Sequence, residues 1–153
     1  MRGPASLTTD DSLWPLVIIR YVGSPTLAQF EEGLEKRAAF LRRDEPHFVL
    51  LDAVQGGMLP TEHRQRQVEW WVRHEELIRK KLFGTAYISG TVLSRLTLSA
   101  ILYLKPPVYP YVIAPSLELG VEWVASRMDE TGLHEAAARA RHHFGLIRER
   151  KSG

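Results

Sequence analysis

"LLDAVQGGMLPTEHRQRQ", residues 50–67, places a strand, a glycine loop and a helix one after another. Its β-forming residues end at Asp52, a glycine pair follows at 56–57, and a charged helix is expected to begin near Thr61. A strand that leads through a loop into a helix is the repeating unit of α/β folds. In an open α/β sheet ligands bind beyond the carboxyl ends of the strands, so Asp52 is the first candidate for a functional residue.

The same strand–helix pattern recurs on both sides of this stretch. Short β-branched runs predict strands, and apolar residues at helical spacing predict helices. The predicted strands are residues 15–23, 47–54, 85–89 and 109–114, with a weak edge strand at 5–9, and the predicted helices are 24–43, 59–83, 91–104, 116–128 and 133–151. Such alternation implies parallel strands joined by right-handed crossovers. We therefore expect an α/β fold with a small mixed, mostly parallel sheet of about four to five strands, helices packed on it, and a C-terminal helix.

The length of 153 residues fits a single domain. We expect an N-terminal segment at residues 1–13, the α/β domain at 14–131, and a C-terminal helix with a basic tail at 132–153. The tail either contacts an acidic partner or nucleic acid, or is simply a solvated helix end. The second explanation is the more common one for a charge run of this kind.

Composition excludes several functions. The chain has no cysteine, which rules out disulfides, thiolate metal sites and a cysteine nucleophile, and which fits a reducing compartment. Its 20 Lys and Arg residues against 18 Asp and Glu residues give a net charge of +2, so bulk attraction to nucleic acid is not indicated. The longest nearly apolar stretch, residues 96–104, is shorter than the ~20 residues that span a bilayer, and the first residues do not resemble a signal peptide. We expect a cytoplasmic protein without a membrane span or a nucleic-acid partner.

Four segments carry a resemblance to a known family. They are residues 17–41 (VIIRYVGSPTLAQFEEGLEKRAAFL), 48–54 (FVLLDAV), 86–104 (AYISGTVLSRLTLSAILYL) and 108–124 (VYPYVIAPSLELGVEWV). Their order resembles the SpoIIAA-like branch of the STAS fold, the fold of anti-sigma-factor antagonists, over roughly residues 14–128. The resemblance implies a small mixed sheet with helices packed on it. It also implies a role in protein–protein switching or, in some relatives, in holding nucleotides or lipids.

The sequence departs from this family at its phosphorylation site. The resemblance implies a phosphorylation site, because phosphorylated STAS antagonists carry a serine or threonine just after the aspartate that ends the central strand. Here Ala53, Val54 and Gln55 follow Asp52, and the next hydroxyl is that of Thr61, which we expect to cap a helix. We therefore predict that the phosphorylation switch is absent, and that phosphate would not be found on Thr61 in protein from its native host.

Four polar residues are expected near the carboxyl ends of the strands: Asp52, Gln55, Ser89 and Ser116. Together they form a candidate recognition edge. The alternative is that Asp52 hydrogen-bonds amides of its own loop, as aspartates in turns commonly do. We predict this second role for Asp52. The glycine pair beside it lacks the GxxxxGK[ST] pattern of a phosphate-binding loop.

No sequence motif points to catalysis. The six histidines are not spaced as metal ligands, no GxSxG marks a serine nucleophile, and no spacing suggests a catalytic pair of carboxylates. We predict that the protein is not an enzyme and holds neither a metal nor a cofactor.

The long predicted helix at 59–83 has two faces. The residues expected to face the core are Val68, Trp71, Val72, Ile78 and Leu82. Trp70, His74 and Leu77 then lie on the other side, where an exposed tryptophan beside histidines is typical of a contact surface. The alternative is that a neighbouring helix covers Trp70.

The predicted helix at 91–104 is apolar on every side. Helical spacing is consistent with a stripe that faces the sheet, made of Leu93, Leu96, Ala100 and Leu104. Leu98 and Leu102 then point outward, with Arg95 as the only charge in the helix. We predict that these three residues form a homodimer interface. The alternative is that the helix at 59–83 covers the two leucines within one chain.

Two hypotheses about function follow. The first is a non-enzymatic, STAS-like regulatory module in bacterial signalling that binds protein partners and associates with itself. The second is a carrier that holds a small apolar or nucleotide ligand between the sheet edge and the helix at 91–104. A cavity under that helix would favour the carrier, and a flat apolar outer face would favour the interaction module.

Overall fold

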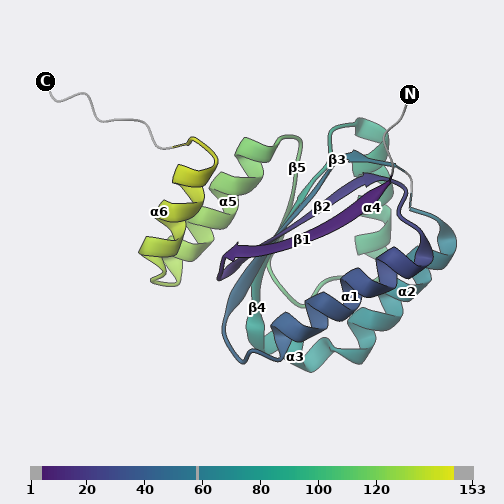
Figure 1. The fold of residues 1–153 in the computed structure, drawn as a ribbon, viewed down its shortest axis with the longest axis horizontal. Coiled ribbons are helices and arrows are strands. Elements are labelled where there is room, and N and C mark those ends of the chain that lie inside the picture. The colour runs from purple at the N-terminus through teal and green to yellow at the C-terminus, as the bar shows by residue number, and fades with distance from the viewer. Residues whose placement is uncertain (1–4, 58, 147–153) are drawn as a thin grey trace, which may run out of the picture.

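The computed structural model describes residues 5–57 and 59–146. The strands in this part of the chain are β1 (Ser6–Leu13), β2 (Leu16–Gly23), β3 (His47–Gly56), β4 (Leu82–Ile88) and β5 (Tyr111–Ala114). The helices are α1 (Leu27–Leu41), α2 (Thr61–Arg73), α3 (Glu75–Lys81), α4 (Val92–Leu104), α5 (Leu117–Glu130) and α6 (His134–His143). Figure 1 shows the sheet between two layers of helices.

The strands form one sheet in the order β1-β2-β3-β4-β5. β1 runs antiparallel to β2, and all other neighbours are parallel. The predicted mixed, mostly parallel sheet is therefore confirmed. The weak edge strand predicted at 5–9 is present as β1, and it extends further than expected, to Leu13.

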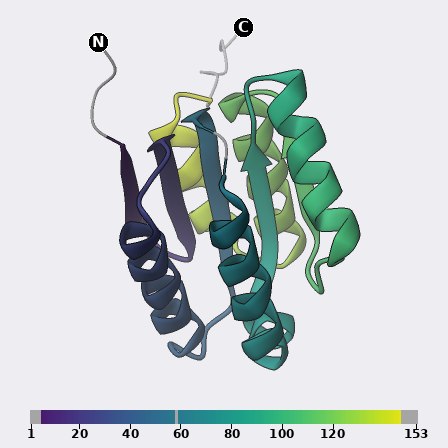
Figure 2. The ribbon, with the colours of Figure 1, turned by 90° about the vertical axis from the view of Figure 1, so that its right-hand side faces the viewer.

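Both faces of the sheet are buried, which explains why its strands read as continuous apolar runs. In β2, Val17 and Ile19 join the core under α1 and α2, whereas Leu16 and Ile18 join the core under α5 and α6. The helices α1 to α4 lie on the first face, and α5 and α6 lie on the second (Figures 1 and 2). The arrangement brings the carboxyl ends of β2, β3 and β4 to one edge, beside α4.

Helix α5 lies unusually close to the sheet at Gly120. A Cβ atom at this position would lie 2.7 Å from Ile88 Cδ1, so a side chain here would force Ile88 or the helix to move. The close approach allows Val121, Val124 and Met128 of α5 to be completely buried. Ala137 and Ala140 of α6 complete the same core.

The prediction of one continuous helix over residues 59–83 was wrong. Its sequence forms two helices, α2 and α3, because His74 leaves the helical conformation (φ −106°, ψ 13°). The ring of His74 folds back onto the preceding turn, where Nδ1 lies 3.0 Å from the carbonyl oxygen of Trp70. Leu82, expected in the helix, is the first residue of β4.

A buried histidine at the start of β3 makes stability depend on pH. Burial lowers the pKa of His47 below its usual 6.5, and its ring stacks on Trp14 with centroids 5.2 Å apart. The unfolded chain therefore binds a proton at His47 at a higher pH than the folded chain does. The contribution to stability is complete above pH 6.5 and is lost as the pH falls below 6.5 towards the lowered folded pKa.

We expect the free energy of unfolding to fall as the pH is lowered below 6.5, and His47→Gln to reduce this pH dependence. Urea unfolding followed by circular dichroism at several pH values measures it. An unchanged slope in the His47→Gln variant would mean that other groups cause the acid sensitivity.

Candidate functional site

A cavity of about 300 Å³ opens at the carboxyl edge of the sheet, between the strand ends, α2 and α4. Its floor comes from β2, β3 and β4, and its walls come from the two helices and the loop after β3. The residues around it are mostly apolar or small. The lining residues include Ala53, Gln67, Trp71, Tyr87, Thr97 and Leu98.

The orientation predicted for α4 was wrong. Leu102 is only 2% exposed and joins the core with Tyr87 and Tyr109, and the half-buried Leu98 packs on the same core and lines the cavity. Leu96 and Leu104, expected to face the sheet, are 63% and 83% exposed. Leu93 and Ala100 are exposed as well. The prediction failed because leucines occupy both sides of this helix, so apolar spacing alone could not decide which side meets the sheet.

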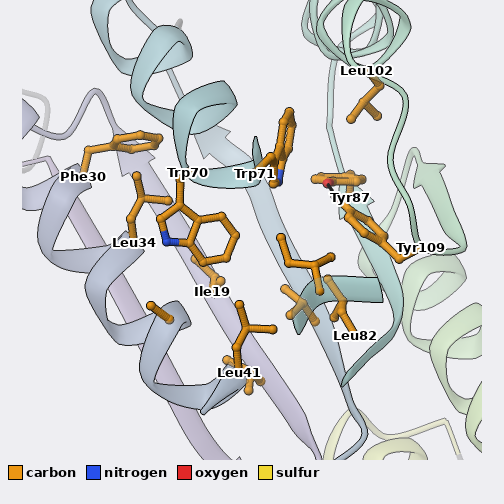
Figure 3. Packing of buried hydrophobic residues seen from close by; sticks show 14 residues of the cluster. Ile19, Phe30, Leu34, Leu41, Trp70, Trp71, Leu82, Tyr87, Leu102 and Tyr109 are labelled. Atoms are coloured by element: carbon orange, nitrogen blue, oxygen red, sulfur yellow. Dashed lines mark hydrogen bonds between the residues drawn. The ribbon is translucent and has the colours of Figure 1, made fainter. Parts of the chain in front are cut away.

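Two tyrosines hold the base of α4 to the sheet. The hydroxyl groups of Tyr87 and Tyr109 are hydrogen-bonded to each other beneath Leu102 (Figure 3). Burial is the main cause that raises the pKa of Tyr87 well above its usual value, and the neighbouring Tyr109 raises it further. Tyr87 also lines the cavity, where it is therefore a neutral aromatic wall.

Hydroxyl groups surround the mouth of the cavity at the start of α4. Thr91 caps the helix by accepting a hydrogen bond from the Ser94 amide at 3.1 Å, and the hydroxyls of Ser89 and Ser94 contact each other. Arg95, predicted to lie at a dimer interface, donates from Nη1 to the carbonyl oxygen of Ser89 at 3.2 Å. Of the four residues predicted at the strand-end edge, only Ser89 lines the cavity.

The predicted contact surface around Trp70 was also wrong. Trp70 is only 7% exposed and packs among Ile19, Leu34 and Leu41 (Figure 3). The Arg37 guanidinium of α1 lies 4.7 Å from the centroid of its ring. The adjacent Trp71 is buried on a different side of α2 and borders the cavity. α2 buries both tryptophans because it lies beside α1 on the same face of the sheet, where residues of both helices share one core (Figure 2).

The other residues predicted around Trp70 have mixed environments. His74 is half-buried and its ring contacts that of Trp70, whereas Leu77 is exposed. Val72, predicted to face the core, is 58% exposed. The break at His74 and the packing of α2 against two neighbours change which residues face the core.

The remaining residues of the predicted strand-end edge do not meet. Asp52 lies on the α5 side of the sheet, Ser116 caps α5 by accepting a hydrogen bond from the Leu119 amide at 3.3 Å, and Gln55 is exposed near the end of β3. Thr61 is the first residue of α2 and not its cap, because the capping position is taken by Pro60. Its hydroxyl instead accepts a hydrogen bond from Arg64 at 2.8 Å.

The loop-bracing contact predicted for Asp52 is present. One carboxylate oxygen accepts a hydrogen bond from the Val54 amide at 3.1 Å, and the other forms an ion pair with Arg20 at 3.2 Å. Asp52→Asn keeps an acceptor for Val54 and weakens a half-exposed ion pair. We expect the free energy of unfolding to fall by about 1 kcal/mol, measured by urea titration. Loss of partner binding at unchanged stability would instead identify Asp52 as a recognition residue.

The side chains most often used in acid–base chemistry are missing from the described lining of the cavity, apart from Tyr21 and Tyr87. Among the described residues that line it there is no histidine, carboxylate, lysine or arginine. In the same part of the chain, no cluster of three or more histidines and carboxylates is placed to hold a metal ion. Within residues 5–57 and 59–146, none of the helices has the length and apolar character needed to cross a membrane.

Solved structures provide the comparison that sequence searches do not. No protein-family model and no curated protein matches the chain. An uncharacterised DUF3478-family protein with a SpoIIAA-like fold, from Shewanella loihica PV-4, superposes with a TM-score of 0.58 at 13% identity, over 80% of this chain and 97% of that one. An anti-sigma factor antagonist from Mycobacterium paratuberculosis gives a TM-score of 0.52 at 13% identity, over 81% of this chain and 98% of that one. The chain therefore has the SpoIIAA-like fold that the sequence resemblance predicted.

Proposed function

We propose that this protein is a non-enzymatic regulatory module of SpoIIAA-like fold that binds a small, largely apolar ligand under α4. The cavity of about 300 Å³ carries this proposal. Clefts of roughly 300–1,000 Å³ lined by apolar side chains with a few polar groups are typical of small-molecule sites. The cavity also lies at the carboxyl edge of a parallel sheet, where such sites are common.

Two further observations support a binding role without chemistry. Apart from Tyr21 and Tyr87, the described residues of the cavity wall offer no general acid or base, and no histidine, lysine or carboxylate among them could activate the serine and threonine hydroxyls. The similarity in fold to an anti-sigma factor antagonist supports a regulatory role, exerted in the cytoplasm through protein partners. Ligand binding would then be the signal that the module passes on to its protein partners.

The outer face of α4 favours a second function, protein–protein interaction. Its large exposed side chains are Val92, Leu96, Tyr103 and Leu104, whereas the equally exposed Leu93 borders the cavity. Large apolar side chains exposed together on one helix favour an interaction site when they form a continuous patch. If the protein forms a homodimer, this face is the one that supports it, in place of Leu98 and Leu102.

A matched pair of variants on α4 tests the ligand site. Thr97 lines the cavity and Ala100 lies on the exposed side of the same helix. Thr97→Phe should fill the cavity and weaken binding of octan-1-ol at least about tenfold, because the ligand loses its space. Ala100→Phe adds the same ring outside the cavity and should leave the affinity unchanged. Isothermal titration calorimetry measures both.

Native mass spectrometry of the purified protein separates the two functions. A retained small mass supports the ligand site, and a doubled protein mass supports the interaction face. Absence of any binding of octan-1-ol to the wild-type protein, together with equal behaviour of the two variants, would contradict the proposed ligand site.

A further inference from the structure

The described residues of the cavity wall carry six hydroxyl groups, and one of these differs from the others. They belong to Tyr21, Tyr87, Ser89, Thr91, Ser94 and Thr97. Five of the six form hydrogen bonds with other groups of the protein. The hydroxyl of Tyr21 has no such bond to any residue within 5–57 and 59–146. Polar groups inside a protein are normally paired, so this hydroxyl is the one that a ligand can satisfy.

The hydroxyl groups around the first turns of α4 are already used. The Thr91 hydroxyl donates to Ser94 Oγ at 2.9 Å, and the Ser94 hydroxyl donates to the carbonyl oxygen of Thr91 at 3.2 Å. Ser89 Oγ contacts Ser94 Oγ, and the Thr97 hydroxyl donates to the carbonyl oxygen of Leu93 at 3.0 Å. These groups bond to one another and to the backbone, so they stabilise the beginning of the helix and do not require a ligand.

Three other polar groups of the wall are closed to a ligand. The hydroxyl of Tyr87 is bonded to that of Tyr109 (Figure 3). The amide nitrogen of Gln67 and the indole nitrogen of Trp71 lack partners among the described residues, but both are sealed even from water. The oxygen of Tyr21 is not one of these sealed atoms. Tyr21 therefore offers an unpaired hydroxyl that a ligand can reach.

The packing of the sheet keeps Tyr21 in place at the cavity. Each of the three strands in the floor contributes one residue near its carboxyl end: Tyr21 from β2, Ala53 from β3, and Ser89 just after β4. Ala53 is the smallest of the three, so space is left between the tyrosine and the serine. The Tyr21 ring also packs on the core, with its centroid 6.5 Å from that of Phe30. Burial raises the pKa of Tyr21, so its hydroxyl keeps its proton at neutral pH and can donate it in a hydrogen bond.

The lining of the cavity favours a neutral occupant. Among the described residues that line it, none carries an ionic side chain. A charged ligand would lose its hydration there without meeting a counter-charge, which is strongly unfavourable. A carbonyl oxygen is neutral, accepts a hydrogen bond, and brings no hydrogen of its own that would need a second acceptor. It is therefore the partner that best fits an unpaired tyrosine hydroxyl in an apolar wall.

We infer that the ligand is a small apolar ketone or ester, whose carbonyl oxygen accepts a hydrogen bond from Tyr21 while its apolar part fills the space under α4. This inference rests on the proposed ligand site and names the chemical class of its ligand. Leu51, Leu98 and Ile101 contribute the apolar wall that such a molecule contacts. Apolar cavities of about 150 Å³ hold benzene, so a cavity of about 300 Å³ has room for a substituted ring.

Acetophenone and ethylbenzene form a matched pair of probes, because they differ only in a carbonyl group that replaces a methylene group. Tyr21→Phe removes the hydroxyl and keeps the ring that packs on Phe30. We expect calorimetry to show that this variant binds acetophenone about fivefold more weakly than the wild-type protein does, as for the loss of one neutral hydrogen bond. Its affinity for ethylbenzene should be unchanged, since ethylbenzene has no acceptor.

Tyr103→Phe is the matched control. Tyr103 is 85% exposed on the outer face of α4, so the loss of its hydroxyl should change the affinity for neither probe. Infrared spectroscopy of bound acetophenone gives a direct readout, because a hydrogen bond weakens the carbonyl bond. The carbonyl band should lie at a lower frequency in the wild-type and Tyr103→Phe proteins than in the Tyr21→Phe protein.

The outcomes separate this inference from the ligand site on which it rests. Unchanged acetophenone affinity and an unchanged carbonyl band in the Tyr21→Phe protein would overturn the inference. It would also fail if the wild-type protein bound ethylbenzene but not acetophenone. In both cases the ligand site stands if Thr97→Phe blocks the binding of ethylbenzene and octan-1-ol. If the wild-type protein binds none of the three probes, the ligand site itself is contradicted.

Discussion

Replacing Trp70 by alanine is expected to lower the free energy of unfolding by about 3–5 kcal/mol, a large share of the ~5–15 kcal/mol typical of a domain. The side chain is 7% exposed and packs among residues of β2 and α1 (Figure 3). Its removal leaves a cavity in the core and also takes the aromatic face away from the buried Arg37 guanidinium. Urea unfolding followed by circular dichroism measures the change.

Val72→Ala is the matched control for this variant. Val72 lies on the same helix but is 58% exposed, so its truncation should change stability by less than about 0.5 kcal/mol. A loss below about 1 kcal/mol for Trp70→Ala would mean that Trp70 forms the exposed contact surface that the sequence suggested.

The double variant Leu98→Glu with Leu102→Lys is expected to unfold the protein or reduce it to a loosely packed state. Leu102 is fully enclosed by the core beneath α4, and Leu98 borders the cavity. A charge placed at the buried position lacks a partner and costs several kcal/mol, in addition to the lost apolar burial. Near-ultraviolet circular dichroism and thermal unfolding measure the outcome.

Leu96→Glu with Leu104→Lys applies the same pair of charges to the outer face of α4. Both leucines are exposed, so this protein should fold and unfold much like the wild type. If the outer face forms a homodimer, light scattering will show that this variant is monomeric. A folded monomer from the Leu98 and Leu102 variant would contradict the orientation of α4 described above.

The fold could be predicted because its evidence is spread over the whole chain. Alternation of β-branched runs with helical periodicity defined the order of the elements, and the helix predicted at 91–104 matches α4 to within one residue. The facing of individual helices could not be predicted in the same way. α4 is apolar on both sides, and α2 contacts two neighbours, so a single apolar stripe was the wrong expectation for each.

The cavity was predicted only as one of two alternatives, and the burial of Gln67 and Arg37 was missed. Gln67 and Arg37 belong to residue types that are usually exposed, so composition gave no reason to place them inside. A signal was nevertheless present in α1. Arg37 falls on the same helical stripe as Leu34 and Leu41, where a buried position is expected. A charged residue within an apolar stripe is the kind of local inconsistency that accompanies a functional site.

The rim formed by β1 limits how this protein can polymerise. β1 is an outer strand of the sheet, and its pairing with β2 is interrupted between Asp10 and Leu13. Asp10 turns back to accept a hydrogen bond from the Ser12 amide at 2.8 Å, and Asp11 is held by Arg43 at 2.6 Å. An irregular, acidic rim is a poor template for another chain, and the opposite rim, β5, is only four residues long. Concentrated solutions should therefore resist fibril growth by strand addition.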